Sequence, residues 1–427
     1  MSVETPVAPA VSDPGPTLVQ AAGRSYFPIA LAARLPFAMM VVGVLTLVVE
    51  ARGSLTLAGL NSAMVGLGTA VFGPLLGILV DRFGQRRVVL AGAAANSLAL
   101  VALCLVVYSD LPDAAVLGVA FCIGATAPQV SPLSRSRLVG IITGKLAPGR
   151  RAVVFNATMA YESAADELIF IIGPFLVGVL ATVIGPVAPV VGGAVLTAVF
   201  VGAFALHPSG APREVTTRTT SDQAPLKALL APELLTVLVG VLGMGLYFGT
   251  TLTGLTAFLD DRGLADRAGL VYGVMGIGSA CFALAVAKFP TGFTRQARWL
   301  VFGAILLAGS ALYPWVGGVG TMAAALLVAG IGIGPTLVTQ YSLGARRSPL
   351  GRSATVMTML GSAIIVGQSA ASALGGALAQ GVGTHAALLA PMCAAALVVA
   401  AGAADTVLVR RSGRELPSSP GPSAPQP

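Results

Sequence analysis

Three acidic side chains lie within six residues of one another in an otherwise apolar stretch of the sequence. Glu162, Asp166 and Glu167 occur between Ala160 and Gly178, a stretch apolar enough to form a membrane-spanning helix. On a helix, Glu162 and Asp166 are four residues apart and share a face, whereas Glu167 points about 100° away from Asp166. Carboxyl groups inside a membrane are costly and usually functional, and such a group can bind and release a proton.

Basic side chains in other apolar stretches are candidate partners for these acids. Arg34 lies within the first stretch, and Arg135 and Arg137 lie at the end of the fourth. Three interpretations remain open: the acids carry protons, they form a static ion-pair network with the arginines, or they contact a substrate. A network that breaks and re-forms during a working cycle would combine the first two.

The elements that position these residues are twelve apolar stretches, each close to the roughly 20 residues that a helix needs to cross a bilayer. Because a backbone in lipid must satisfy its own hydrogen bonds, we predict that each stretch is a helix and that the fold is all-α. The predicted spans are residues 27–50, 56–80, 88–108, 114–136, 153–180, 186–206, 233–259, 268–288, 299–316, 320–343, 353–379 and 386–408.

Composition and charge support a multi-pass membrane protein. Hydrophobic residues make up 56% of the chain and charged residues 10%, against about 25% charged in a soluble protein. Of the 25 Lys and Arg residues, 21 fall in the tails and in every second gap between spans, which predicts that both termini are cytoplasmic. The net charge of +8 then suits the lipids of a cell membrane, and we expect no nucleic-acid partner. Arginine outnumbers lysine 22 to 3, which suggests a GC-rich bacterial source.

The chain divides into two halves at a polar segment that follows the sixth span. Six spans precede this segment and six follow it, an arrangement typical of transporters with a substrate site between the halves. The predicted divisions are a disordered tail (1–23), an N-terminal six-helix bundle (24–206), a linker (207–230), a C-terminal six-helix bundle (231–409) and a second disordered tail (410–427).

The loop between the second and third spans carries a recognisable pattern, GILVDRFGQRR at residues 77–87. It resembles the G-x-L-a-D-r-x-G-r-r/k signature of the major facilitator superfamily. This resemblance implies a secondary transporter that works by alternating access, with a cytoplasmic gate loop that holds the halves together when the protein faces outward. The gate-loop residues would be Gly77, Asp81, Arg82, Gly84, Arg86 and Arg87. From its residue type, Asp81 can meet a helix N-terminus or an arginine on a neighbouring helix.

A second element favours one direction of transport. Gly173, Pro174 and Gly178 in the fifth span resemble part of the G-P-x-x-G-G element of drug:proton antiporters, with Val177 in place of one glycine. The resemblance therefore favours proton-coupled export of a drug-like compound or metabolite by a twelve-helix antiporter. Proton-coupled import of a sugar or other metabolite remains an alternative, as does a non-transporting sensor or assembly protein on the same fold.

The resemblance also implies that spans one, four, seven and ten line a substrate cavity. Few charges other than Arg34 fall in these spans, which favours a neutral or weakly charged, partly apolar substrate. The candidate substrate contacts are the polar residues Tyr247, Thr251, Gln340, Tyr341 and, in span eleven, Gln368.

Other classes of function lack their sequence patterns. The chain contains no phosphate-binding loop for ATP and no arrangement of nucleophile and base, so we expect a proton gradient as the energy source and no enzymatic activity. Its four cysteines and two histidines are far apart in sequence, so we expect no metal or other cofactor. We expect a monomer whose partners are a small-molecule substrate, protons and membrane lipids.

Overall fold

The computed structural model describes residues 15–210, 223–264, 267–290 and 292–411. Over these residues every regular element is a helix, and twelve segments are long and apolar enough to cross a membrane. The predicted all-α fold class with twelve spans is therefore confirmed. Most of the disordered tails expected at 1–23 and 410–427 (residues 1–14 and 412–427), and much of the expected linker, lie outside the described residues.

The N-terminal half contains α1 (Leu18–Ala22), α2 (Tyr26–Ala32), α3 (Leu35–Arg52), α4 (Leu55–Phe83), α5 (Gln85–Val106), α6 (Asp113–Thr126), α7 (Val130–Lys145), α8 (Pro148–Val183), α9 (Ala188–Leu196), the π-helical turn η1 (Thr197–Val201), α10 (Gly202–Leu206) and the 3-10 turn η2 (Pro208–Gly210). The C-terminal half contains the 3-10 turn η4 (Leu226–Leu230), α11 (Pro232–Asp260), α12 (Ala268–Ala285), η6 (Val286–Lys288), α13 (Arg295–Ala311), η7 (Tyr313–Trp315), α14 (Val319–Arg347), α15 (Ser353–Gly381) and α16 (Thr384–Arg411). Helix α1 forms inside the segment that was expected to be a disordered tail.

Two spans that were predicted to be continuous are each divided into two helices. Span one consists of α2 and α3, which are separated by a turn at Ala33–Arg34, just before Pro36. Span four consists of α6 and α7, and residues 127–129 between them are not helical. Proline lacks a backbone N–H and disfavours helical geometry in the residue before it, and Ala127, which precedes Pro128, is accordingly extended (ψ 119°).

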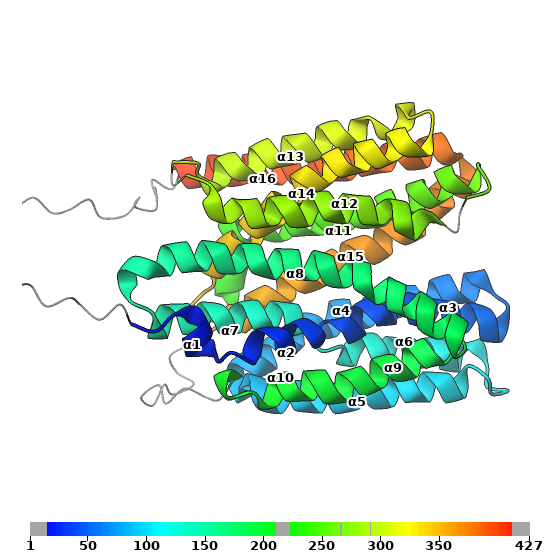
Figure 1. The fold of residues 1–427 in the computed structure, drawn as a ribbon, viewed down its shortest axis with the longest axis horizontal. Helices are drawn as coiled ribbons and strands as arrows, with labels where there is room; N and C mark the ends of the chain where they lie inside the picture. The colour runs from blue at the N-terminus through cyan, green and yellow to red at the C-terminus, as the bar shows by residue number, and fades with distance from the viewer. Residues whose placement is uncertain (1–14, 211–222, 265–266, 291, 412–427) are drawn as a thin grey trace, which may run out of the picture.

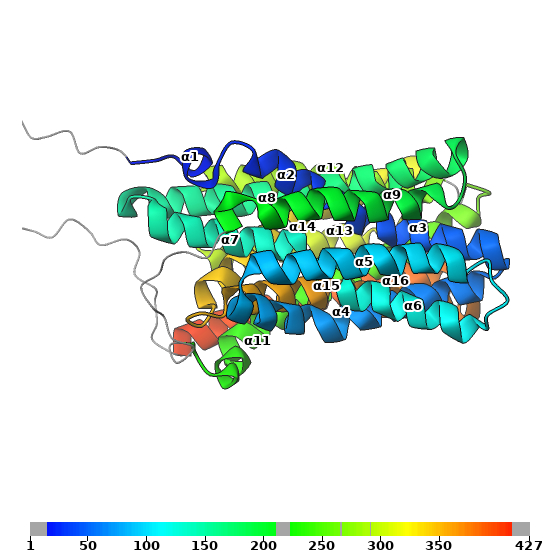
Figure 2. The ribbon, with the colours of Figure 1, turned by 90° about the horizontal axis from the view of Figure 1, so that it is seen from below.

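The helices run along the long axis of the molecule (Figures 1 and 2), and Figure 1 shows them in two groups. Helices α11 to α14 and α16 form one group, α2 to α7, α9 and α10 form the other, and α8 and α15 lie between them (Figure 1). Helix α1 and the last turn of α16 lie at the same end of the bundle. We call this the basic end, because the helix termini there carry Arg82, Arg86, Arg347, Arg410 and Arg411.

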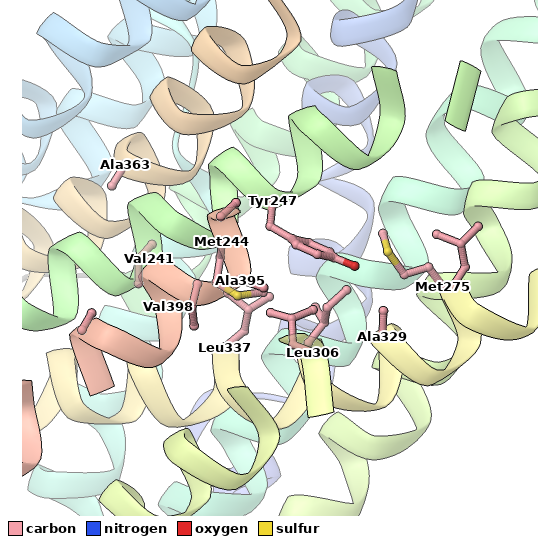
Figure 3. Packing of buried hydrophobic residues seen from close by; sticks show 14 of the residues in the cluster. Val241, Met244, Tyr247, Met275, Leu306, Ala329, Leu337, Ala363, Ala395 and Val398 are labelled. Atoms are coloured by element: carbon pink, nitrogen blue, oxygen red, sulfur yellow. The ribbon is translucent and has the colours of Figure 1, made fainter. Parts of the chain in front are cut away.

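The hydrophobic cores of the two halves differ. The C-terminal half has one continuous core, which includes Tyr247, Leu306 and Val398 (Figure 3). The N-terminal half has two separate cores, one around Tyr26 towards the basic end and one around Leu47 towards the opposite end. The turn at Arg34 falls between these two cores along span one, so polar groups occupy the middle of the N-terminal half.

Small residues bring the two halves into close contact along α4 and α15. A methyl group added at Gly66, Gly73 or Gly77 of α4 would overlap Ser369, Ser362 or Thr358 of α15, respectively. Glycine at these positions permits the two helix backbones to approach closely, as small residues do in membranes. Helix α8 makes the corresponding contact on the other side with α12 and α14 of the C-terminal half.

Candidate functional site

The intramembrane acids and arginines form one cluster at the middle of α8. Arg34 Nη2 lies 2.6 Å from Glu162 Oε2, and Arg34 Nη1 lies 3.1 Å from Asp166 Oδ1. Arg135 Nη2 of α7 lies 2.8 Å from the other oxygen of Asp166. Two arginines therefore balance two carboxylates, and Asp166 is shared between spans one and four.

Three hydroxyl groups extend this cluster. Ser131 donates a hydrogen bond to Asp166 Oδ2 (2.6 Å) and accepts one from Arg135 Nη1 (2.5 Å). Ser134 donates to Glu162 Oε1 (3.0 Å), and its Oγ lies 2.7 Å from the hydroxyl oxygen of Tyr26 in α2. We did not identify these serines from the sequence, although their spacing of three residues on α7 places both on the face that carries Arg135.

The other two candidate charges lie apart from the cluster. Glu167 faces the C-terminal half, where Ser279 of α12 donates a hydrogen bond to its Oε1 (2.8 Å), and no cation pairs with it among the residues that the structure describes. Arg137 donates instead to Gln85 Oε1 (2.8 Å) and to the carbonyl of Phe204 (2.9 Å). The expected contact between Arg137 and the acids is therefore absent from this conformation.

A cavity of about 90 Å³ adjoins the cluster at the boundary between the two halves. Asp166 is the most exposed member of the cluster, with 22% of its side chain accessible against 4% for Arg34, 2% for Arg135 and 0% for Glu162. The cavity is lined by Arg34, Phe37, Ala38, Pro128, Gln129, Val130, Ser131, Pro132, Asp166, Ile169, Phe170, Tyr341, Gly361, Ile364 and Ile365. The Asp166 carboxylate thus lies within reach of a molecule bound in the cavity.

Of the five predicted substrate contacts, Tyr341 is the one that lines this cavity. Its ring lies against Arg135, with 4.0 Å between the ring centroid and the guanidinium carbon. Tyr247 forms a hydrogen bond to Tyr313 (2.6 Å between hydroxyl oxygens) in the core of the C-terminal half (Figure 3), where Thr251 is also buried. Gln340 is buried close to Gly240, and Gln368 is half-buried away from the cavity lining.

The predicted gate loop connects the two halves at the basic end. Asp81 accepts hydrogen bonds from the backbone N–H groups of Ala354 (3.1 Å) and Thr355 (2.8 Å) in the first turn of α15. Gly84 has a positive φ of 86° where α4 ends and α5 begins, a backbone conformation that glycine adopts without strain. Arg82, Arg86 and Arg87 are exposed at this end, whereas Asp81 and Gly77 meet the first turns of α15 in the other half.

The element at Gly173, Pro174 and Gly178 lies in α8, which continues without a break through Pro174. A methyl group at Gly173 would meet Ala38 Cβ at 2.6 Å, so this glycine lets α8 pack closely against the first turn of α3 beside the cavity. Nothing lies within 4 Å of a methyl group at Gly178. Gly173 therefore has a packing role that Gly178 lacks in this conformation.

The geometry of two six-helix bundles, a latch at Asp81 and charges at the centre can now be set against known proteins. The family model of the Major Facilitator Superfamily matches residues 26–363. The chain belongs to this superfamily. The fold is therefore that of a secondary transporter. Membership of this superfamily indicates a transporter rather than an enzyme. A comparison of this chain with curated proteins found no match.

Solved structures of other transporters share the fold. The human organic anion transporter MFSD10 (TETRAN) is 17% identical with a TM-score of 0.69, over 91% of this chain and 100% of that one. A bacterial homologue of the iron transporter ferroportin, in an outward-facing state, is 14% identical with a TM-score of 0.70, over 90% and 99% of the two chains. The fucose:proton symporter of E. coli is 16% identical with a TM-score of 0.64, over 90% and 99%. At these identities the likeness shows the fold.

A second buried ion pair lies in the C-terminal half, and we did not predict it. Arg347 at the end of α14 forms a bidentate pair with Asp405 of α16, which is completely buried. Thr236 also donates to Asp405 (2.9 Å), and Arg347 donates to the carbonyl of Glu233 (2.6 Å), so the pair ties α11, α14 and α16 together. Its sequence signal was a lone acid within the apolar twelfth span.

Proposed function

We propose that this member of the superfamily is a proton-coupled exporter of small, partly apolar organic compounds. The observation that carries the proposal is the position of Asp166, which pairs with two arginines from different spans and is also exposed to the cavity. Protonation of Asp166 would release Arg34 and Arg135 from one partner each. A proton bound there therefore changes how spans one, four and five hold together.

Glu167 supports the proposal from the other face of α8. Ionising a carboxyl group in a low-dielectric interior is costly when no cation pairs with it. No cation among the described residues pairs with Glu167, so the neutral form of Glu167 is favoured while it contacts Ser279. Ser279 belongs to the C-terminal half, so separation of the halves would expose Glu167 and allow it to ionise. Such a group would take up a proton in one conformation and release it in another.

The direction and orientation are parts of the same proposal. Export rests on the likeness of Gly173 and Pro174 to the antiporter element. In this chain Gly173 packs against span one beside the cavity. The distribution of arginine and lysine favours an orientation in a cell membrane with the basic end and both termini in the cytoplasm, in contact with anionic lipids. We propose that the protein works as a monomer, since each half supplies part of the cavity lining.

The test is proton movement in proteoliposomes that contain purified protein and a pH-sensitive dye. Lipophilic drugs, sugars and amino acids would be added in turn, with Asp166→Asn, Glu162→Gln and Glu167→Gln as variants. We expect a pH change that depends on a drug-like compound and is lost in Asp166→Asn. The Asp166→Asn protein should still be correctly folded in the membrane, which shows that the loss is not a folding defect.

The other outcomes identify the alternatives. Substrate and protons moving in the same direction would indicate an importer, as in the symporter that shares the fold. Transport without any pH change would remove proton coupling and leave the carboxylates as a static network. No transport of any compound, from protein shown to be folded, would favour a sensor or assembly protein.

A further inference from the structure

The described end of the linker crosses the boundary between the two halves beside the gate loop. We call residues 223–225 the strap, and they lead into η4 and α11 of the C-terminal half. The half-buried side chain of Gln223 reaches the N-terminal half, where its Nε2 donates a hydrogen bond to the backbone carbonyl of Asp81 (2.9 Å). The strap therefore contacts the last turn of α4 without using the Asp81 side chain.

The backbone of the strap is fastened to the C-terminal half. The N–H of Ala224 donates to the carbonyl of Leu350 (3.0 Å), and Nε of Arg352 donates to the carbonyl of Ala224 (3.0 Å). Gly351, between these two partners, has a positive φ of 70°, and a methyl group there would meet Gln223 Cγ at 3.0 Å. Both backbone polar groups of Ala224 are therefore bonded to the turn between α14 and α15.

The carbonyl that Gln223 contacts belongs to the C-terminal turn of α4, which ends at Phe83. The last carbonyls of a helix have no partner within the helix and need a donor from elsewhere. The N–H of Gly84 donates to the carbonyl of Val80, and Gln223 supplies a donor for the next carbonyl, that of Asp81. Two segments of the C-terminal half thus bind Asp81: the first turn of α15 binds its carboxylate, and the strap binds its backbone.

We propose that the strap is a second latch of the basic end, carried by the C-terminal half and released from α4 when that end opens. Because Ala224 is fixed to the turn before α15, separation of the halves at this end breaks the bond from Gln223 to Asp81. The segment that connects the halves along the chain then also affects how readily they separate. This inference goes beyond the proposed function, since it depends on neither the substrate, the direction of transport nor the driving ion.

The two contacts on Asp81 can be removed separately. Asp81→Ala removes the carboxylate but keeps the backbone carbonyl, so the bond from Gln223 remains possible. Gln223→Met keeps the shape of the side chain, removes its donor and leaves the contact with α15 intact. A hydrogen bond between neutral groups is weaker than one to a carboxylate, so loss of the strap bond should raise the ratio of open to closed protein only roughly two- to tenfold.

The first experiment measures distances between spin labels in lipid nanodiscs without substrate. The labels would be on cysteines introduced at Arg87 and Arg346, which are exposed in opposite halves and lie outside the strap, after replacement of the native cysteines. Gln223→Met would be compared with Gln223 in three backgrounds in which the α15 latch is intact, weakened by Thr355→Val or broken by Asp81→Ala. We expect the ratio of open to closed protein to rise roughly two- to tenfold with Gln223→Met wherever both populations are detected.

Gln380→Met is the matched control, because Gln380 is exposed near the far end of α15. It should leave the distance distribution unchanged in every background. An unchanged ratio for Gln223→Met in all three backgrounds would overturn the proposal, and so would an equal shift in Gln380→Met. The readout needs no substrate, so this result stands apart from the proteoliposome test: proton coupling could fail while the strap holds, and the reverse.

The second experiment tests which half carries the strap. Hydrogen exchange would be followed by mass spectrometry in a peptide that covers residues 223–230, which contains the N–H of Ala224. If the strap stays with the C-terminal half, exchange should be equally slow in the unaltered protein and in the opened Asp81→Ala variant. Arg352→Gln removes the donor to the Ala224 carbonyl and should speed exchange. Faster exchange in Asp81→Ala would contradict the proposal, because the strap would then detach from the turn when the basic end opens.

Discussion

Asp81 and Thr355 join the two halves of the transporter across 274 residues of sequence. One carboxylate oxygen of Asp81 accepts hydrogen bonds from both the backbone N–H (2.8 Å) and the hydroxyl (2.6 Å) of Thr355. Asp81 also receives the N–H of Ala354, so its negative charge lies at the N-terminus of α15, where the helix dipole is favourable. These bonds close the basic end, while the backbone contacts of Gly77 with the same turn keep the helices close.

Replacing Asp81 with Ala should open the basic end. The change removes three hydrogen bonds to a charged group, each contributing about 1.5–3 kcal/mol, so the population should shift strongly towards a conformation with the basic end separated. The measurement is the distance between spin labels on cysteines introduced at Phe83 and Leu350, which are exposed in opposite halves. The four native cysteines would first be replaced.

Thr355→Val is the graded control for this latch. It removes only the hydroxyl and keeps both backbone bonds, so the label distances should shift less than in Asp81→Ala. If Asp81→Ala leaves the distance distribution unchanged, other contacts hold the basic end closed and the latch assignment is wrong.

Replacing Arg135 with Gln should destabilise the protein through the charge cluster. Asp166 would keep the hydrogen bond from Ser131, but its cation would be Arg34, which is shared with Glu162, and a buried charge without full compensation costs about 3–5 kcal/mol. Thermal unfolding in detergent should show a clearly lower midpoint. Arg24→Gln, at an exposed position, should change stability by no more than about 0.5 kcal/mol. The double variant Arg135→Gln/Asp166→Asn should recover stability, and its failure to do so would show that Arg135 acts mainly through Tyr341.

The number of spans could be predicted because the bilayer imposes one length and one polarity on every crossing segment. The breaks at Arg34 and Gln129 could not, because an average over about 20 residues hardly registers a single proline. Yet those breaks place Arg34 and Gln129 at the cavity. Pro36 and Pro128 lie at the two breaks, but α4, α8, α14 and α16 continue through internal prolines (Pro74, Pro174, Pro335 and Pro391), so a proline alone does not mark a break.

Partner choice within the site depended on helix rotation, which the sequence pattern leaves open. Arg135 and Arg137 are two residues apart, so they point about 200° from each other on α7, and only one can face α8. Composition does not distinguish the two. For the same reason Tyr341 lines the cavity while its neighbour Gln340 is buried against the C-terminal core.

Replacing Arg347 with Met should destabilise the C-terminal half without affecting proton coupling. The variant leaves Asp405 buried and unpaired, which costs about 3–5 kcal/mol. The double variant Arg347→Met/Asp405→Leu exchanges the pair for apolar side chains and should regain most of the stability. The measurements are the unfolding midpoint and substrate-dependent proton movement. Loss of proton movement in the stable double variant would place this pair in the transport cycle.

His207 connects the N-terminal segment to the end of span six. The backbone N–H of Ser209 donates to His207 Nδ1 (3.2 Å), so Nδ1 is unprotonated and the Nε2–H of the neutral ring donates to Ser25 Oγ (3.1 Å). The ring also packs edge-on against Tyr26, with centroids 5.6 Å apart. Burial, and then the charge of Arg137, lower the pKa of His207 below its ordinary value of 6.5.

Acidification should therefore loosen the N-terminal segment. Because the folded protein favours neutral His207, the contribution of this residue to stability is present above pH 6.5 and is lost as the pH falls through its lowered pKa. Hydrogen exchange in residues 18–32, corrected for intrinsic rates, should become faster between about pH 7.5 and about pH 5. His207→Asn keeps an acceptor near the position of Nδ1 but does not titrate, so its exchange should be nearly independent of pH. The same pH dependence in both proteins would show that another group loosens the segment.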